Sequence, residues 1–151
     1  MEPVPSRCNL SKWMDYEPVK WKPLRDIVIP MSHNSAMHTV NEAPMKERKS
    51  IMLKIAGGIL KSSMKALALC QSLPIYEQLC AGVRSFDIRI MKSPKGVMYT
   101  AHSVYGPPLE EVLLAFCGFI TENPSEVLFL HFRQDHGIPF IKKKLKPPGT
   151  T

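Results

Sequence analysis

Two histidines and two arginines follow short apolar runs of the sequence, and together they could cleave a phosphodiester. His33 and His102 could share the proton transfers, one taking a proton from an attacking hydroxyl and the other giving a proton to the leaving oxygen. Imidazole suits both tasks because its unperturbed pKa is about 6.5. The guanidinium groups of Arg89 and Arg133 could neutralise the charge that builds on phosphorus. His33 alone would be interpreted as a histidine that caps a loop, so the hypothesis requires the four side chains to meet.

Four predicted strands would bring these side chains together. The apolar or alternating runs that predict them are 27–29, 83–90, 97–102 and 127–133. Helical periodicity over 72–82 and 108–122 lies between strands, and alternating strands and helices are typical of a parallel sheet or barrel. Because chemistry in such folds gathers at the carboxyl ends of the strands, we expect those ends to form the site.

The strand at 83–90 is the most informative of the four. Phe86 and Ile88 alternate with Asp87 and Arg89, so the charged pair should lie on the face opposite the helices. Two charges on the inner face of a strand, near its carboxyl end, are costly to bury unless they are paired. A structural ion pair is the alternative, but the position at the carboxyl end of a strand favours function.

Composition limits the partners and the compartment. The 151 residues fit one domain, and a net charge of +7 with a pI near 9.3 indicates an anionic partner. No zinc-finger spacing or aromatic-interleaved basic motif favours nucleic acid. The four cysteines show no disulfide framework, which favours a reducing compartment. There is no signal peptide and no apolar run near the roughly 18 residues that span a bilayer, so we expect a cytoplasmic protein that is peripheral at membranes.

Three segments lie outside the predicted core elements. Residues 1–23 carry Trp13 and Trp21, which could cover the core or touch a membrane interface. Residues 45–70 predict a basic amphipathic helix or two, which could bind anionic lipid or a calmodulin-like partner, or could be a solvated insertion. Residues 142–151 form a basic, proline-containing tail that we expect to be disordered.

Two boxes of this sequence resemble phosphatidylinositol-specific phospholipases C. The segment 29–35, Ile-Pro-Met-Ser-His-Asn-Ser, is similar to the first box of that family, and 78–89 is similar to the second. Residues 123–130 resemble the segment that closes this half of the domain. The resemblance covers about 24–136 and is nearest to the X-domain-containing proteins that lack accessory domains, so we assign residues 24–141 to a partial X domain.

The resemblance implies an α/β fold of the TIM type, a (β/α) barrel of which about four N-terminal units are present. By position, His33 is similar to the general base, His102 to the general acid and Arg89 to the phosphate-stabilising arginine. Asp87 matches a carboxylate that also belongs to the catalytic set. The implied reaction is attack of the inositol 2-hydroxyl on phosphate, with diacylglycerol as the leaving group.

The same comparison bears on metal and substrate contacts. Arg133 falls at a substrate-contacting position, and we assign Asn34 to substrate binding as well. Calcium-dependent members carry carboxylates where Arg89 and Arg133 stand, whereas Asn34 matches the calcium-dependent type. Two arginines would repel a divalent cation, so we expect no metal and no other cofactor, with calcium disfavoured. His38 and Ser35 are interpreted as loop residues. We interpret His131 as packing support for the site.

The sequence departs from the family pattern in two respects. Met31 stands where the family has glycine, and a positive φ there would strain a methionine. Such barrels usually need about 250 residues, so we expect a truncated product, with open sheet edges and doubtful activity in isolation.

Two hypotheses of function follow. The first is a phosphoric diester hydrolase or lyase that cleaves the glycerol–phosphate bond of phosphatidylinositol-type lipids at an anionic membrane surface. The alternative is a catalytically inactive lipid- or partner-binding fragment. A glycerophosphodiester phosphodiesterase is less favoured, because that group needs clustered carboxylates for a metal. The sequence does not predict the oligomeric state or which inositol lipid is preferred.

Overall fold

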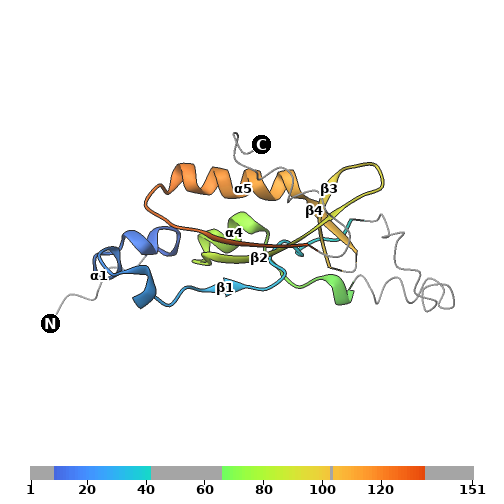
Figure 1. The fold of residues 1–151 in the computed structure, drawn as a ribbon. Coiled ribbons are helices and arrows are strands. Elements are labelled where there is room, and N and C mark those ends of the chain that lie inside the picture. Colours follow the sequence, from blue (N-terminus) through green and yellow to red (C-terminus); the bar gives the residue numbers. More distant parts are fainter. Residues whose placement is uncertain (1–8, 42–65, 103, 135–151) are drawn as a thin grey trace, which may run out of the picture.

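The computed structural model describes residues 9–41, 66–102 and 104–134, and it builds them around one curled, mixed sheet (Figure 1). The strands are β1 (Met31–Ser32), β2 (Ser85–Lys92), β3 (Met98–Ala101), β4 (Tyr105–Pro108) and β5 (Phe129–Gln134). The central strand β2 pairs in parallel with β1 and β5 and antiparallel with β3, which in turn pairs antiparallel with β4.

The register of β2 and β5 sets which side chains are neighbours. Asp87 lies opposite His131 and Arg89 lies opposite Arg133. The alternation of side chains along each strand therefore puts all four on one face, with Arg89 and Arg133 one step nearer the carboxyl ends. The arginines thus form the rim of this face. His131 lies one step before them, but it is exposed, so the expected packing role is not observed.

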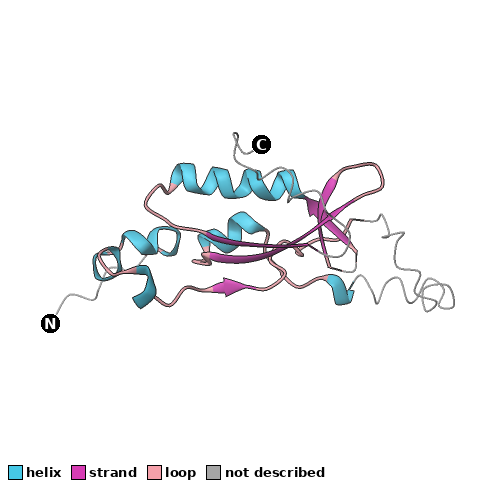
Figure 2. Cartoon of the chain, viewed as in Figure 1, coloured by secondary structure: helices cyan, strands magenta, loops and turns pink. Residues whose placement is uncertain are grey.

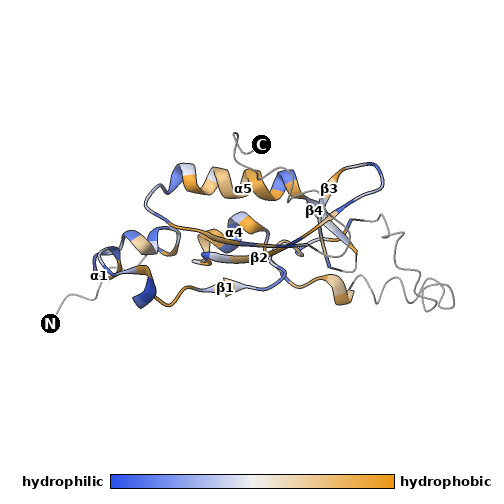
Figure 3. Cartoon of the chain, viewed as in Figure 1, coloured by the Kyte–Doolittle hydropathy of each residue, from blue (hydrophilic) through white to orange (hydrophobic). Residues whose placement is uncertain are grey.

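Two helices cover the opposite face of the sheet, as Figure 2 shows. Helix α4 (Ile75–Cys80) follows Pro74, and helix α5 (Leu109–Glu122) follows Pro108. Figure 3 shows apolar colour on β2 and along α5, and the Phe86 and Phe116 rings pack edge to face at 4.9 Å. The buried core combines both helices with β2; its members are Ala36, Ile75, Leu79, Phe86, Ile88, Ile90, Val112, Phe116 and Phe119.

The amino-terminal segment packs against the beginning of β2. It contains η1 (Leu10–Asp15), α1 (Glu17–Lys20) and η2 (Leu24–Asp26). Trp13 donates to the carbonyl of Gly82 at 2.9 Å, so this tryptophan does cover the core, whereas Trp21 is 76% exposed.

Three expectations about the strands were wrong. The apolar run at 27–29 lies outside the sheet, and β1 begins only at Met31, because β2 starts opposite it at Ser85. The strand at 98–101 forms an antiparallel hairpin with β2, so it does not continue the parallel sheet that was expected. Residues 105–108, expected to be a loop and the start of a helix, form β4. The strand at 83–90 and the helix at 108–122 were predicted correctly to within two residues at each end.

Several expectations fall on residues outside the described ranges. These include residues 45–65 of the basic segment and the tail at 142–151. Within the described part of the chain, no helix has the length and apolar character needed to cross a bilayer.

Candidate active site

The carboxylate of Asp87 is the centre of a cluster of basic side chains. Its Oδ2 lies 3.5 Å from His33 Nε2 and 3.7 Å from Arg89 Nε, and its Oδ1 lies 3.5 Å from Arg133 Nε. The side chain of Asp87 is 1% exposed, whereas those of His33 and Arg133 are 68% and 67% exposed. A buried anion thus holds basic groups whose outer faces are open to solvent.

His33 and Arg89 also contact each other directly. Arg89 Nη2 lies 3.0 Å from His33 Nε2. Nε2 of His33 therefore faces both the Arg89 guanidinium and the Asp87 carboxylate.

The loop that carries His33 is fixed to β2 by Ser35 and Asn34. Ser35 Oγ donates to the Ser32 carbonyl at 2.7 Å and accepts from the Asp87 backbone N–H at 2.9 Å. The backbone N–H of Asn34 points to Asp87 Oδ2 at 3.4 Å. Ser35 is fully buried, which agrees with a loop-bonding role. The positive φ of this loop, 48°, belongs to Asn34, whereas Met31 lies in β1.

His102 is connected to this loop through Cys70. His102 Nδ1 lies 3.3 Å from Cys70 Sγ, and Asn34 Nδ2 lies 3.5 Å from the same sulfur. His102 follows β3 directly, and because β3 runs antiparallel to β2 it returns toward the level of Arg89. The structure therefore places both predicted histidines around the loop at 33–37.

Cys70 and Gln71 are site residues that the sequence reasoning missed. The backbone N–H groups of both donate to the carbonyl of Met37, and Gln71 Nε2 donates to the carbonyl of His33 at 2.8 Å. No spacing in the sequence marks these residues, because they lie within a segment interpreted only by its charge and apolar periodicity.

The predicted site residues do not all meet. His33, Arg89 and Arg133 gather at the Asp87 carboxylate. His102 contacts Cys70 instead and, among the residues that the structure describes, is linked to this cluster only through the loop that carries His33. Asn34 joins the cluster through its backbone, but its side chain is directed to Cys70 and the residue is 3% exposed. His131 contacts Ser85 Oγ at 3.2 Å in the layer below. The roles assigned to these residues stay predictions.

The described residues offer no evident metal site. No group of three or more His, Cys, Asp or Glu side chains gathers there in an arrangement that could hold an ion. The absence of a metal cofactor remains a prediction, supported by the two guanidinium groups that already neutralise Asp87.

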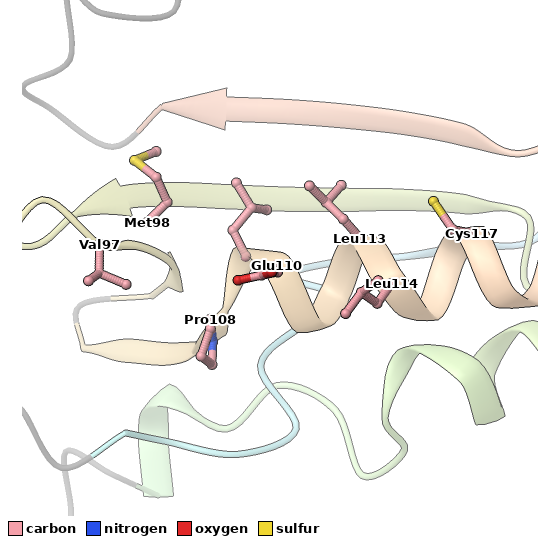
Figure 4. A pocket seen from close by; sticks show the side chains of 8 residues that line it. Val97, Met98, Pro108, Glu110, Leu113, Leu114 and Cys117 are labelled. Atoms are coloured by element: carbon pink, nitrogen blue, oxygen red, sulfur yellow. The ribbon is translucent and has the colours of Figure 1, made fainter.

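An apolar groove of about 430 Å³ lies elsewhere, between the β2–β3 hairpin and the start of α5 (Figure 4). Val97, Met98, Leu113 and Leu114 contribute to its walls. It is on the helix-covered side of the sheet, whereas Asp87 faces the other side. The groove is therefore separate from the cluster of basic residues.

The curled, mixed sheet with helices on its outer face has the fold of part of a TIM-type barrel. Solved structures of phosphatidylinositol-specific phospholipase C from Listeria monocytogenes (TM-score 0.63, 22% identity) and a double mutant of the Staphylococcus aureus enzyme (0.61, 24%) share the fold. The matches cover 87% and 84% of this chain, and 41% and 36% of those structures. The expectation of a partial TIM-type barrel is confirmed.

Curated relatives give the family. The chain is 33% identical over 133 residues to the human PI-PLC X domain-containing protein 2, covering 83% of this chain and 43% of that protein. It is 32% identical over 123 residues to a Dictyostelium discoideum PI-PLC X-box domain-containing protein, covering 80% of this chain and 16% of that protein. No family model matches. We therefore place the chain, over the matched residues, in the family of PI-PLC X domain-containing proteins, and it spans less than half the length of these relatives.

Proposed function

We propose that this chain carries the phosphate-binding and proton-transfer residues of a phosphoric diester hydrolase or lyase acting on phosphatidylinositol-type lipids. The observation that supports this most directly is the convergence of His33, Arg89 and Arg133 on the buried carboxylate of Asp87. Two guanidinium groups and one carboxylate leave a net positive charge at the rim, which suits a phosphodiester.

In the proposed reaction, His33 takes the proton of the inositol 2-hydroxyl as that oxygen attacks phosphorus. Arg89, which lies 3.0 Å from Nε2 of His33, and Arg133 stabilise the charge of the transition state by preorganised hydrogen bonds. His102 gives a proton to the departing glycerol oxygen. Asp87 holds the basic groups in place and offsets their mutual repulsion.

The test is turnover of phosphatidylinositol in mixed vesicles by the full chain. We expect His33→Ala and His102→Ala each to lower turnover by about 100-fold or more, the scale of one acid–base group. His131→Ala is the matched control, because His131 contacts Ser85 below the site and should retain most of the activity.

The outcome separates the two hypotheses. Turnover that depends on both histidines supports the enzyme. Binding to vesicles without turnover would contradict it and would support the alternative, a lipid- or partner-binding fragment. In either case we propose action at an anionic membrane surface from the cytoplasmic side, without insertion of a spanning helix.

A further inference from the structure

We infer that Cys70 is a positioning residue for His102, fixing a proton on Nδ1 so that Nε2 is the nitrogen that exchanges protons. The inference rests on the proposed function for its catalytic meaning. Its structural basis is the group of contacts that three different segments make to one sulfur atom.

The hydrogen bonds at Cys70 determine which partner donates. Its thiol has a single proton, and its Sγ lies 3.4 Å from the carbonyl oxygen of Ala68, which can only accept. The thiol proton therefore goes to Ala68. Asn34 Nδ2 donates to the sulfur from a second side at 3.5 Å.

The remaining contact is then a donation from His102. With its own proton directed to Ala68, Cys70 Sγ acts as the acceptor at 3.3 Å, so Nδ1 of His102 carries hydrogen. This hydrogen bond selects the neutral tautomer protonated on Nδ1 and orients the ring. A histidine side chain that is free in water prefers the other tautomer, protonated on Nε2.

The selected tautomer matches the task of a general acid. When His102 acts, its Nε2–H bond breaks and the proton passes to the leaving oxygen, while the Nδ1–H bond and its contact to sulfur are retained. The ring thus reaches its favoured neutral form without rearrangement, which is the advantage of a preorganised partner.

Backbone hydrogen bonds hold Cys70, and therefore its sulfur atom, in place. The N–H groups of Cys70 and Gln71 both donate to the carbonyl of Met37, at 2.9 and 3.2 Å. The side chain of Gln71 donates to the carbonyl of His33. The same short segment therefore contacts the loop that carries His33 and the ring of His102.

The first experiment is NMR observation of the His102 ring nitrogens in the full chain at about pH 8, where an ordinary histidine is neutral. We expect the Nδ1-protonated tautomer in the unmodified chain and in Cys70→Ser, which keeps a donor and an acceptor. In Cys70→Ala the proton should move to Nε2. Cys117→Ala, which removes an exposed thiol on α5, is the control and should change nothing. The same tautomer in Cys70→Ala and the unmodified chain would overturn the inference.

The second experiment is steady-state turnover with the same variants. We expect Cys70→Ala to lower kcat by about tenfold, the scale of one hydrogen bond to a charged group, with KM nearly unchanged. Cys70→Ser should recover part of the loss. An unchanged kcat in Cys70→Ala contradicts a positioning role. If the unmodified chain shows no turnover, the proposed function fails, and the tautomer measurement still decides the inference.

Discussion

Asp87 combines two properties that rarely occur together: it is buried, and three basic side chains approach it from the solvent side. A buried carboxylate is costly unless it is paired, and here the pairing groups are the same ones that would contact a phosphate. Its Oδ1 has no hydrogen bond in the described structure, only the ion pair with Arg133. Asp87 should therefore contribute both to the stability of the fold and to the proposed chemistry of the site.

Replacing Asp87 by asparagine should therefore affect stability and activity together. The guanidinium groups of Arg89 and Arg133 would repel each other without the carboxylate, and we expect a loss of about 1–3 kcal/mol in the free energy of unfolding, measured with urea. Turnover should fall by about 100-fold or more. Asp15→Asn is the control, because Asp15 pairs with Lys20 on the surface and should cost less than about 1 kcal/mol. Equal effects of the two variants would contradict the role of Asp87.

Tyr76 gives a pH-dependent prediction away from the site. Its hydroxyl donates to the carboxylate of Glu122, and this hydrogen bond raises the pKa of Tyr76 to about 12 from its ordinary value of 10.0. Because the folded-state pKa is raised, the stabilisation is complete below pH 10 and is lost as pH rises toward 12. Absorbance titration of the phenolates should show one late-ionising tyrosine that Tyr76→Phe removes. Glu122→Gln should lower the pKa of Tyr76; a late transition that persists would contradict the assignment.

At the scale of elements, strand β2 organises the molecule because its two faces have different chemistry. One face carries Phe86 and Ile88 into the core under α4 and α5, and the other carries Asp87 and Arg89 into the site. At its start, Arg84 is fully buried and pairs with Glu126 at 2.7 Å. Arg84 also donates to the carbonyls of Leu10 and Ser11, so one side chain ties η1 to the sheet.

Breaking the pair between Arg84 and Glu126 should be among the most damaging changes to stability. Glu126→Gln leaves a buried guanidinium without its counter-ion, and we expect a loss of about 3–5 kcal/mol in the free energy of unfolding. Lys20→Ala is the matched control, since it removes only surface ion pairs with Asp15 and Glu17. Urea unfolding curves of both variants provide the measurement, and a loss below about 1 kcal/mol in Glu126→Gln would contradict the prediction.

Two glycines make a matched pair for packing. An added Cβ at Gly106 in β4 would lie 2.6 Å from Thr100 Oγ1 and 2.7 Å from Met37 Sδ, whereas at Gly118 in α5 it would meet nothing within 4 Å. We expect Gly106→Ala to destabilise the protein by about 1–3 kcal/mol through overpacking. Gly118→Ala should stabilise it by about 0.5–1 kcal/mol, because glycine disfavours a helix interior. Thermal unfolding of both variants tests this, and shifts of the same sign would contradict it.

The sequence predicted correctly those elements whose formation depends on their own residues. The alternation along β2 and the apolar periodicity of α5 are properties of their own residues, and both elements form as predicted. The run at 27–29 has strand-like residues but lies beyond the start of β2, so no strand is there to pair with it. Conversely, β4 contains Gly106 and two prolines, and it is a strand only because β3 pairs with it. Cys70 was missed for the same reason, since its contacts with Asn34 and His102 join residues distant in sequence.

At the scale of the whole molecule, the positive charge is unevenly distributed along the chain. The net charge is +7, and residues 45–70 hold six lysines and arginines against one glutamate. The described site adds two guanidinium groups around one carboxylate. Both concentrations of positive charge favour an anionic partner, which suits the proposed action at an anionic membrane surface.

Removing charges from two different segments tests whether residues 45–70 bind anionic lipid or are a solvated insertion. If this segment binds anionic lipid, replacing Lys46, Arg48 and Lys49 by glutamine should weaken binding to phosphatidylinositol-containing vesicles by about 1 kcal/mol per charge. The same replacement of Lys12, Lys20 and Lys22 removes an equal charge from the amino-terminal segment and should have a smaller effect, because Lys20 already pairs with Asp15 and Glu17.

Vesicle co-sedimentation at two salt concentrations provides the measurement for these variants. Binding by the unmodified chain should fall as salt rises from about 0.1 M to about 1 M, where the Debye length shrinks from about 10 Å to about 3 Å. The variant that lacks the charges of residues 46–49 should show a weaker salt dependence, and neutral phosphatidylcholine vesicles should bind neither protein well. Equal losses in the two triple variants would mean that only net charge matters, and residues 45–70 would then be a solvated insertion rather than a lipid-binding segment.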